Sequence, residues 1–181
     1  RQDRLLLNDG TGRFHEAASD ALPLRGTAEE TREADLGDVD GDGDLDLLFA
    51  NVRLFVQDAT RQNRLLLNNG TGVFSNATGR LPNDDASALD GDFVDVTGDG
   101  ALDIVLSNVT FDGERIVSAP YRVWRNDGAG GFTDETASVF PSPVLGRGLD
   151  SEAHDFDGDG RLDLYLCSRG TVDRLLLHAA N

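Results

Sequence analysis

The sequence predicts an all-β protein built from repeats of roughly 60 residues. An acidic nine-residue motif occurs three times, and its copies begin at Asp38, Asp95 and Asp155. A second motif, in which a short apolar run is followed by Asn and Gly, alternates with the first. No stretch shows the sustained periodicity of an amphipathic helix, so we expect short strands joined by tight turns.

The acidic motif reads DVDGDGDLD, DVTGDGALD and DFDGDGRLD in its three copies. Positions 1, 3, 5 and 9 carry oxygen-bearing side chains in every copy, and positions 4 and 6 are glycine. A loop that curls around one point can offer the roughly six to eight oxygen ligands that Ca²⁺ prefers. Glycine at position 6 permits the positive φ that such a sharp curl requires. The motif therefore predicts a calcium-binding loop in each copy.

Position 7 is expected to contribute a backbone carbonyl, by analogy with the EF-hand loop. It is occupied by Asp44, Ala101 and Arg161, and a backbone ligand explains why its side chain varies. The motif is not an EF-hand, because position 12 is apolar in every copy instead of the bidentate Glu. Zinc is not expected without a Cys/His cluster, and magnesium is less expected because it rarely uses an all-protein cage.

The alternative interpretation of the motif is an acidic surface turn, because Asp and Gly are common turn residues. Three copies in register argue against it, and so does electrostatics. Two like charges about 4 Å apart repel by about 1 kcal/mol in water and about 4 kcal/mol near a protein surface. A bound cation would remove that repulsion. The second copy is the weakest predicted site, because Thr97 stands where the other copies have Asp40 and Asp157.

The second motif predicts a strand, a tight turn and another strand, because Asn and Gly tolerate positive φ. It occurs at 4–14, 64–74 and 123–132, with a last fragment at 173–181. The segments before the acidic loops, at 32–38, 89–95 and 150–155, also look extended. One unit is therefore a strand, an acidic loop, a strand, a linker, a strand, an Asn-Gly hairpin and a final strand.

Four short antiparallel strands per unit is the pattern of a β-propeller blade. The predicted boundaries are a half blade at 1–27, blades at 28–84 and 85–145, and a partial blade at 146–181. Propellers have 4–8 blades and this chain has about three. We therefore expect the chain to be a piece of a longer array, or to be completed by other copies through strand addition.

The stretches GDVDGDGDLDLLFAN, DVTGDGALDIVLSN and DFDGDGRLDLYLCS, with the paired RLLLNDGTGRF-type hairpins, resemble the FG-GAP/VCBS repeat family. That family forms the blades of integrin-α-like propellers and of many secreted bacterial proteins. The resemblance covers nearly the whole chain and implies a Ca²⁺ ion in each loop, three in all. The implied ligand positions are Asp38, Asp40, Asp42, Asp44 and Asp46, then Asp95, Thr97, Asp99, Ala101 and Asp103, then Asp155, Asp157, Asp159, Arg161 and Asp163.

Composition limits the partners and the location. The net charge is −17 and the pI is near 4.3, so no nucleic-acid partner is expected. No apolar run approaches the length of a transmembrane helix, so no membrane insertion is expected. Such loops suit the millimolar calcium outside cells, which predicts a secreted or cell-surface protein. The chain contains no Met, even at position 1, and therefore looks processed or cut from something longer.

The expected function is a scaffold for protein association, adhesion or self-assembly, with other copies or further blades as partners. A protein or glycan ligand is possible. The alternative is a carbohydrate-binding propeller in which Tyr121, Trp124 and Tyr165 stack on sugar rings, although core packing explains these aromatics more simply.

A polysaccharide-active enzyme is the least expected function, and we predict no catalytic residues. Glycosidases need a free pair of carboxylates, and most paired carboxylates here belong to the predicted loops. His15, His154 and His178 lie in different repeats, and no Ser lies in a G-x-S-x-G motif.

Overall fold

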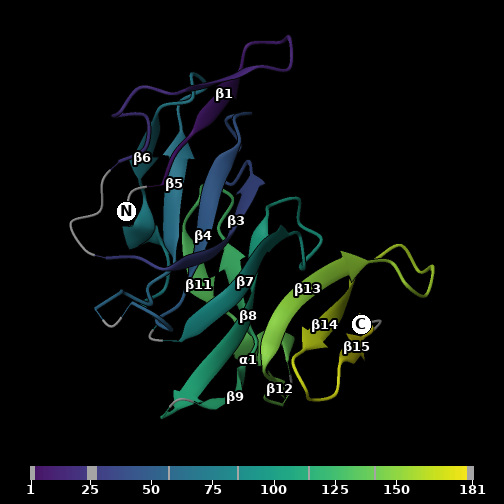
Figure 1. Cartoon of the computed structure of the whole chain (residues 1–181). Helices are drawn as coiled ribbons and strands as arrows, with labels where there is room; N and C mark the ends of the chain where they lie inside the picture. Colours follow the sequence, from purple (N-terminus) through teal and green to yellow (C-terminus); the bar gives the residue numbers. More distant parts are fainter. Residues whose placement is uncertain are drawn as a thin grey trace.

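The computed structural model describes residues 3–23, 28–56, 58–84, 86–113, 115–140 and 142–178. Within these ranges the chain is almost entirely β-structure, arranged in four antiparallel sheets (Figure 1). The helical elements described are one 3-10 turn, Thr78–Arg80, and one short α-helix, α1 (Thr136–Val139), each of which directly follows a strand at the edge of a sheet. The predicted all-β fold is confirmed.

The first complete sheet contains β3 (Thr31–Gly37), β4 (Asp46–Asn51), β5 (Arg64–Asn68) and β6 (Phe74–Asn76), in that order. All three pairings are antiparallel. The acidic loop joins the first two strands, and the Asn-Gly turn joins the last two. The central strands β4 and β5 are mostly buried, which accounts for their continuous apolar sequences.

The second sheet repeats this order and adds a hairpin. Its four repeat strands are β7 (Ser87–Val94), β8 (Asp103–Asp112), β10 (Arg122–Asn126) and β11 (Phe132–Asp134). The segment predicted as a linker instead continues β8 and returns as β9 (Arg115–Pro120), which pairs with β12 (Leu145–Gly146). The physical reason is that apolar and β-branched residues run on past the expected strand end until Gly113 turns the chain with φ of 62°.

Incomplete sheets flank these two. At one end, β1 (Leu6–Asn8) pairs with β2 (Phe14–Glu16). At the other, β13 (Gly148–His154), β14 (Asp163–Ser168) and β15 (Arg174–Leu176) form a three-stranded sheet. The four sheets follow one another from purple to yellow in Figure 1, and the described residues do not close a ring.

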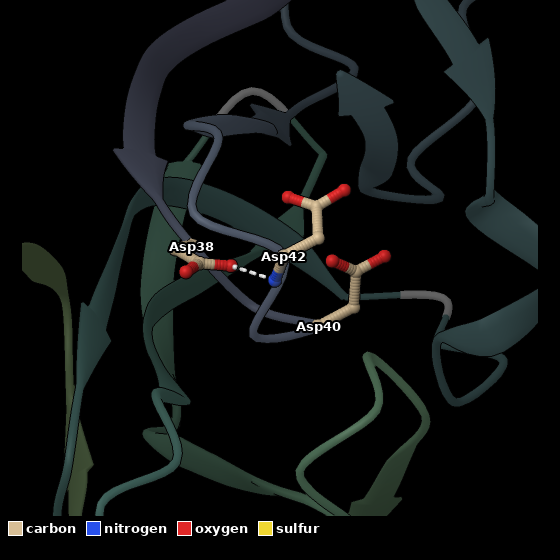
Figure 2. Close-up of side chains that lie close together, drawn as sticks. All are labelled: Asp38, Asp40 and Asp42. Carbon is tan, nitrogen blue, oxygen red and sulfur yellow. Dashed lines mark hydrogen bonds between the residues drawn. The ribbon is translucent and has the colours of Figure 1, made fainter. Parts of the chain in front are cut away.

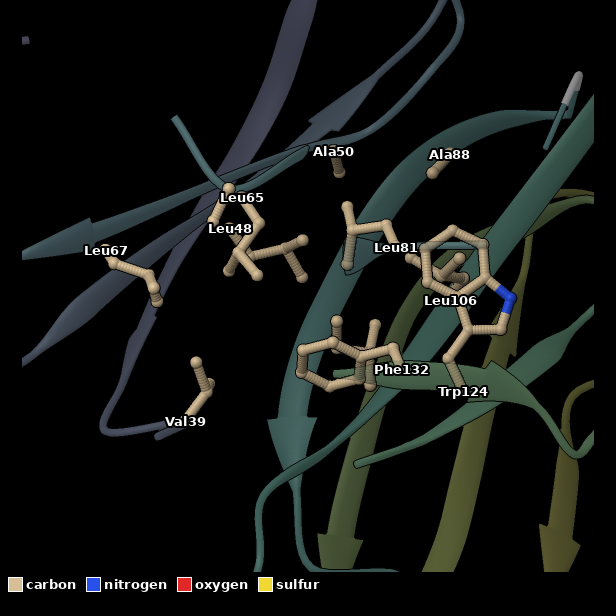
Figure 3. Close-up of a cluster of buried hydrophobic side chains, with 12 residues drawn as sticks. Val39, Leu48, Ala50, Leu65, Leu67, Leu81, Ala88, Leu106, Trp124 and Phe132 are labelled. Atoms are coloured by element: carbon tan, nitrogen blue, oxygen red, sulfur yellow. The ribbon is translucent and has the colours of Figure 1, made fainter. Parts of the chain in front are cut away.

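The core lies between neighbouring sheets. A central strand contributes side chains to two apolar clusters, one on each face of its sheet. Leu65 and Leu67 of β5 pack toward the second sheet, with Trp124 in the same cluster (Figure 3). Leu66, between them, packs instead with Phe49 and residues near the N-terminal hairpin. Successive side chains of a strand point to opposite faces, so one strand contributes to both layers. This is how short strands bury enough surface to hold a row of sheets together.

The first strands of three sheets lie side by side, with β7 between β3 and β13 (Figure 1). Small residues permit this approach. A Cβ added at Gly37 of β3 would lie 2.9 Å from Phe93 Cδ2 of β7, and one at Gly148 of β13 would lie 2.6 Å from the carbonyl carbon of Ser107 in the second sheet. The three acidic loops begin at the ends of these strands, so their positions follow from this packing.

Candidate metal centres

The three acidic loops share one internal hydrogen-bond pattern. The position-1 carboxylate of Asp38 accepts backbone N–H bonds from Gly41 at 2.8 Å, Asp42 at 3.2 Å and Gly43 at 3.0 Å. Asp95 and Asp155 accept the equivalent three bonds in their own loops. The loop therefore curls around its first carboxylate. Gly41 and Gly43 have φ of 77° and 93°, which explains glycine at positions 4 and 6.

The position-9 carboxylate fastens each loop to the neighbouring hairpin motif. Asp46 is 1% exposed, and its two oxygens accept the N–H groups of Val39 at 3.0 Å and Asn68 at 2.9 Å. Asp163 accepts the corresponding N–H groups of Phe156 and His178, whereas Asp103 accepts those of Asn126 and of Thr97, one position later in its loop. Burial raises the pKa of Asp46 above its usual value. The two sequence motifs are thus parts of one structural unit, joined by this carboxylate.

The first loop fits a hard divalent cation. One carboxylate oxygen from each of Asp38, Asp40 and Asp42 lies within 4.8 Å of the others, and Figure 2 shows the three side chains around the same turn. Oδ1 of Asp40 is buried and accepts no hydrogen bond from the part of the chain that the structure describes. A buried oxygen that has lost water without gaining a donor is costly, and a cation would satisfy it.

The third loop also gathers three carboxylates, from Asp155, Asp157 and Asp163. Its position-5 residue, Asp159, instead forms an ion pair with Arg161. The third carboxylate of this group is the buried Asp163 at position 9, whereas in the first loop it is Asp42 at position 5. Both loops therefore offer three converging anionic oxygens, with a different choice of positions.

The second loop does not form such a group among the described residues. Oδ2 of Asp99 accepts a hydrogen bond from Nη2 of Arg125 at 2.7 Å, and this bond is the main reason that the pKa of Asp99 is lowered. Asp95 keeps the same backbone bonds as Asp38, and Asp103 accepts the N–H of Thr97 at position 3 in place of that of position 2. Three of the five predicted ligand positions therefore converge in the first loop and in the third, and no three described carboxylates do so in the second.

The position-7 residues are held through their backbone in all three loops. Asp44, Ala101 and Arg161 each donate an N–H to the position-5 carboxylate, at 3.0, 3.1 and 2.9 Å. These bonds do not involve the side chain of position 7, which agrees with the variation there. The carbonyl groups as metal ligands stay a prediction.

A further acidic cluster lies outside the loops, and sequence reasoning missed it. Asp90 and Asp92 on β7 and Asp150 on β13 place carboxylate oxygens within 4.8 Å of one another. Glu33 and Asp35 on β3 face the same group. The available signal was the alternation of acidic residues along the first strands, which puts them on one face.

Burial dominates the electrostatics of this cluster. Asp90 is 5% exposed, and burial together with Asp92 and Asp150 raises its pKa to about 8. Burial likewise raises the pKa of Glu33 to about 7, with Asp35, Asp92 and Asp150 adding to the shift. The N–H of Ser151 donates to Asp90 at 3.1 Å, and its hydroxyl bonds Asp92. The cluster is therefore a protonatable contact between sheets, and its donors are of a type that can also hold a metal ion.

The aromatic residues considered for sugar binding are mostly internal. Trp124 and Tyr121 are fully buried, and the Tyr121 hydroxyl donates to the carbonyl of Cys167 at 2.7 Å. Tyr165 is half-buried, and its hydroxyl bonds Asp173 at 3.1 Å. Two of the three rings therefore cannot stack on a ligand, and core packing explains them.

Comparison with known proteins agrees with these repeats. The FG-GAP-like repeat matches residues 1–49, 52–106 and 112–166, which together cover most of the chain. The chain belongs to the FG-GAP-like repeat family. It is also 30% identical over 166 residues to cartilage acidic protein 1 of Xenopus tropicalis, an alignment that covers 90% of this chain and 24% of that protein. The chain thus spans about a quarter of the length of this relative.

The FG-GAP repeats are offset from the sheets. The first match ends within β4, the second within β8 and the third within β14, each the second strand of a sheet. Each of the first two FG-GAP repeats therefore contributes the last two strands of one sheet and the first two of the next, and the third also includes β9 and β12. The chain therefore passes from one sheet to the next in the middle of a repeat, and each repeat ends in the strand that follows its acidic loop.

Proposed function

We propose that this chain is a calcium-stabilised FG-GAP scaffold module of an extracellular protein, which works by association and not by catalysis. The observation that carries the proposal is the first loop. Three carboxylates converge there, and the buried Oδ1 of Asp40 lacks a donor within the described residues. The same loop pattern in three repeats shows that it is a regular part of the fold.

The residues that would hold the ion are Asp38, Asp40 and Asp42 in the first loop and Asp155, Asp157 and Asp163 in the third. When bound, Ca²⁺ supplies the positive charge that offsets repulsion among the carboxylates. Because the unfolded chain has no preformed site, calcium binding adds to the free energy of folding. Each loop joins two strands and is bonded through position 9 to the third strand, or in the third loop to His178 just after it, so the effect extends to the sheet.

Two observations support an extracellular location. Loops of this type suit the millimolar calcium found outside cells. The name of the Xenopus relative refers to cartilage and to acidity, and this chain carries a net charge of −17. Separately, none of the described helices is long and apolar enough to cross a membrane.

The proposed partners are further blades of a longer chain, or a second copy of this one. Within the described residues, β1 pairs only with β2, and β15 pairs only with β14, so each has an open edge. Leu6 and Leu175, on these strands, are each 50% exposed. Open edges beside exposed apolar side chains are suited to strand addition.

The test of the calcium role is a thermal melt of the purified chain in millimolar CaCl₂, in excess EDTA and in MgCl₂. We expect a lower melting temperature in EDTA that calcium restores and magnesium does not. An identical melt in all three solutions would contradict the proposal, because the loops would then be acidic turns with no structural ion.

A pair of variants assigns the effect to the loops. Asp42→Ala removes a carboxylate of the first loop, and we expect weaker calcium binding and a lower melting temperature in calcium. Asp157→Ala tests the third loop in the same way, because Asp157 is one of its three converging carboxylates. The matched control is Asp112→Ala, which removes an exposed carboxylate at the end of β8, away from the acidic loops. Equal effects from all three variants would indicate a general charge effect and no specific site.

A further inference from the structure

The second acidic loop differs from the other two in the side chain that faces its position-5 carboxylate. Nη2 of Arg125 lies 2.7 Å from Oδ2 of Asp99, and both side chains are partly exposed. Arg125 comes from β10, at the position just before the Asn of the hairpin turn. It therefore reaches the loop from the third strand of the same sheet, next to the buried Asp103.

The equivalent position is leucine in the other hairpin motifs. In each of the three sheets, one residue after the third strand's apolar run donates its N–H to the position-9 carboxylate. These donors, which occupy equivalent positions, are Asn68, Asn126 and His178. The preceding residues are Arg125 in the second sheet, and Leu67 and Leu177 in the sheets beside it. The N-terminal hairpin has Leu7 before its Asn8. Among these motifs, a positively charged side chain at this position occurs only beside the second loop.

The second loop uses its carboxylates internally. Oδ1 of Asp99 accepts the N–H of Ala101 at 3.1 Å, and Oδ2 accepts the guanidinium of Arg125. The Thr97 side chain also hydrogen-bonds Asp99. Because position 3 is Thr, the loop has one carboxylate fewer, and Arg125 neutralises another. The charge and the free oxygens that a divalent ion needs are both reduced.

The third loop also contains an ion pair, but its effect differs. Arg161 engages Asp159, yet Asp155, Asp157 and the position-9 Asp163 still converge. In the second loop no three described carboxylates do so. An arginine near the loop is therefore not sufficient to disperse the ligands. The combination of Thr97 and Arg125 distinguishes the second loop.

We propose that Arg125 takes the place of the calcium ion in the second loop, so that the chain binds two Ca²⁺ ions and not three. The inference rests on the proposed calcium role of the other two loops. Arg125 is a specificity-determining residue in this assignment. It supplies a permanent positive charge to the loop, and the second sheet keeps its acidic turn at any calcium concentration.

The test is the number of calcium ions bound, measured by equilibrium dialysis with radioactive calcium at saturation. We expect two ions for the natural chain, and the same count when Asp90→Asn disrupts the carboxylate cluster outside the loops. Thr97→Asp combined with Arg125→Leu restores the residue types of the first loop, and we expect three ions for this double variant. Three ions in the natural chain, or two in the double variant, would overturn the inference and leave the proposed function intact. No bound calcium in the natural chain would overturn the proposed function, and this assignment with it.

A matched variant separates the charge from the shape of the side chain. Thr97→Asp combined with Arg125→Lys supplies the missing carboxylate but keeps a positive charge beside Asp99. We expect this variant to bind two ions, one fewer than the leucine variant. Binding of three ions would show that Arg125 does not exclude calcium. Circular dichroism and a thermal melt of each variant in EDTA establish that the chains compared are folded.

Discussion

At the scale of single residues, the aspartates of one loop divide into two groups. Positions 1 and 9 use both oxygens to accept backbone N–H bonds, as Asp38 and Asp46 do in the first loop. Asp40, at position 3 of the first loop, lacks this role, because its buried Oδ1 has no donor among the described residues. The charge at position 3 is therefore not needed for the loop's own hydrogen bonds. Substitutions in the two groups should respond differently to calcium.

Asp40→Asn should have opposite effects on the melting temperature in EDTA and in calcium. In EDTA the variant loses a like-charge repulsion of about 1 kcal/mol, so its melting temperature should equal or exceed that of the natural chain. In calcium it loses an anionic ligand and should melt below the natural chain. The measurement is a pair of thermal melts for each protein. A variant that melts lower in both solutions would show that Asp40 is structural.

Asp46→Asn should destabilise the chain with or without calcium. The buried carboxylate accepts N–H groups on both oxygens, and the amide of Asn would point a donor at one of them. An unsatisfied buried donor costs about 1–3 kcal/mol, which we expect to see in urea unfolding in either solution. A loss confined to calcium-containing buffer would mean that Asp46 acts mainly as a ligand.

At the scale of strands and sheets, close packing of the first strands sets the position of the loops. β13 passes next to β8 where Gly148 meets the backbone of Ser107 and Asn108. The register of β13 and β14 also shifts between Gly148 and Asp150. A strand can approach this closely only where it carries no side chain.

Gly148→Ala should therefore separate these strands. Its Cβ would lie 2.6 to 2.8 Å from backbone atoms of Ser107 and Asn108, which cannot rotate away as a side chain can. Overpacking of this kind costs about 1–3 kcal/mol, measurable by urea unfolding. Gly79→Ala is the control, because a Cβ there meets nothing within 4 Å and its φ is not positive. Equal stability of the two variants would contradict the close approach.

The strands, the turns and the acidic loops could be predicted because each has a local signature. Alternating apolar runs, Asn-Gly turns and the DxDxDG spacing are read within about ten residues. β9 was missed because its signal is an apolar run that crosses an expected boundary. Arg125 was not recognised because only strand pairing shows that it faces Asp99. The cluster around Asp90 likewise depends on the packing of strands that are distant in sequence.

At the scale of the whole molecule, the row of sheets concentrates negative charge along its inner strands. Glu33 on β3, Asp92 on β7 and Asp150 on β13 face Asp90, and Asp35 on β3 faces Glu33 and Asp92. Asp90 and Glu33 have pKa values raised to about 8 and about 7, mainly by burial. Neighbouring sheets therefore meet across groups that hold protons near neutral pH. Their contact is most stable when those protons are present.

The free energy of unfolding in EDTA should fall as the pH rises through neutrality. Unfolded carboxyls release their protons near pH 4, whereas folded Asp90 and Glu33 hold theirs until about pH 8 and about pH 7. Between these pH values the folded state binds more protons than the unfolded state. The stability that these two carboxyls contribute is therefore fully present below about pH 4 and is lost as the pH rises to about 8. Urea unfolding at about pH 5.5 and about pH 8.5 measures the difference.

Asp90→Asn identifies the source of this pH dependence. The amide oxygen can still accept the N–H of Ser151, and the side chain no longer ionises. We expect a smaller loss of stability between the two pH values than in the natural chain, whereas the exposed control Asp112→Asn should leave the loss unchanged. EDTA is needed because a divalent ion among Asp90, Asp92 and Asp150 would favour the ionised forms and oppose the trend. An equal slope in the Asp90 variant would show that the pH dependence arises elsewhere, because a contact between sheets that weakens through ionisation of Asp90 must weaken less when that side chain can no longer ionise.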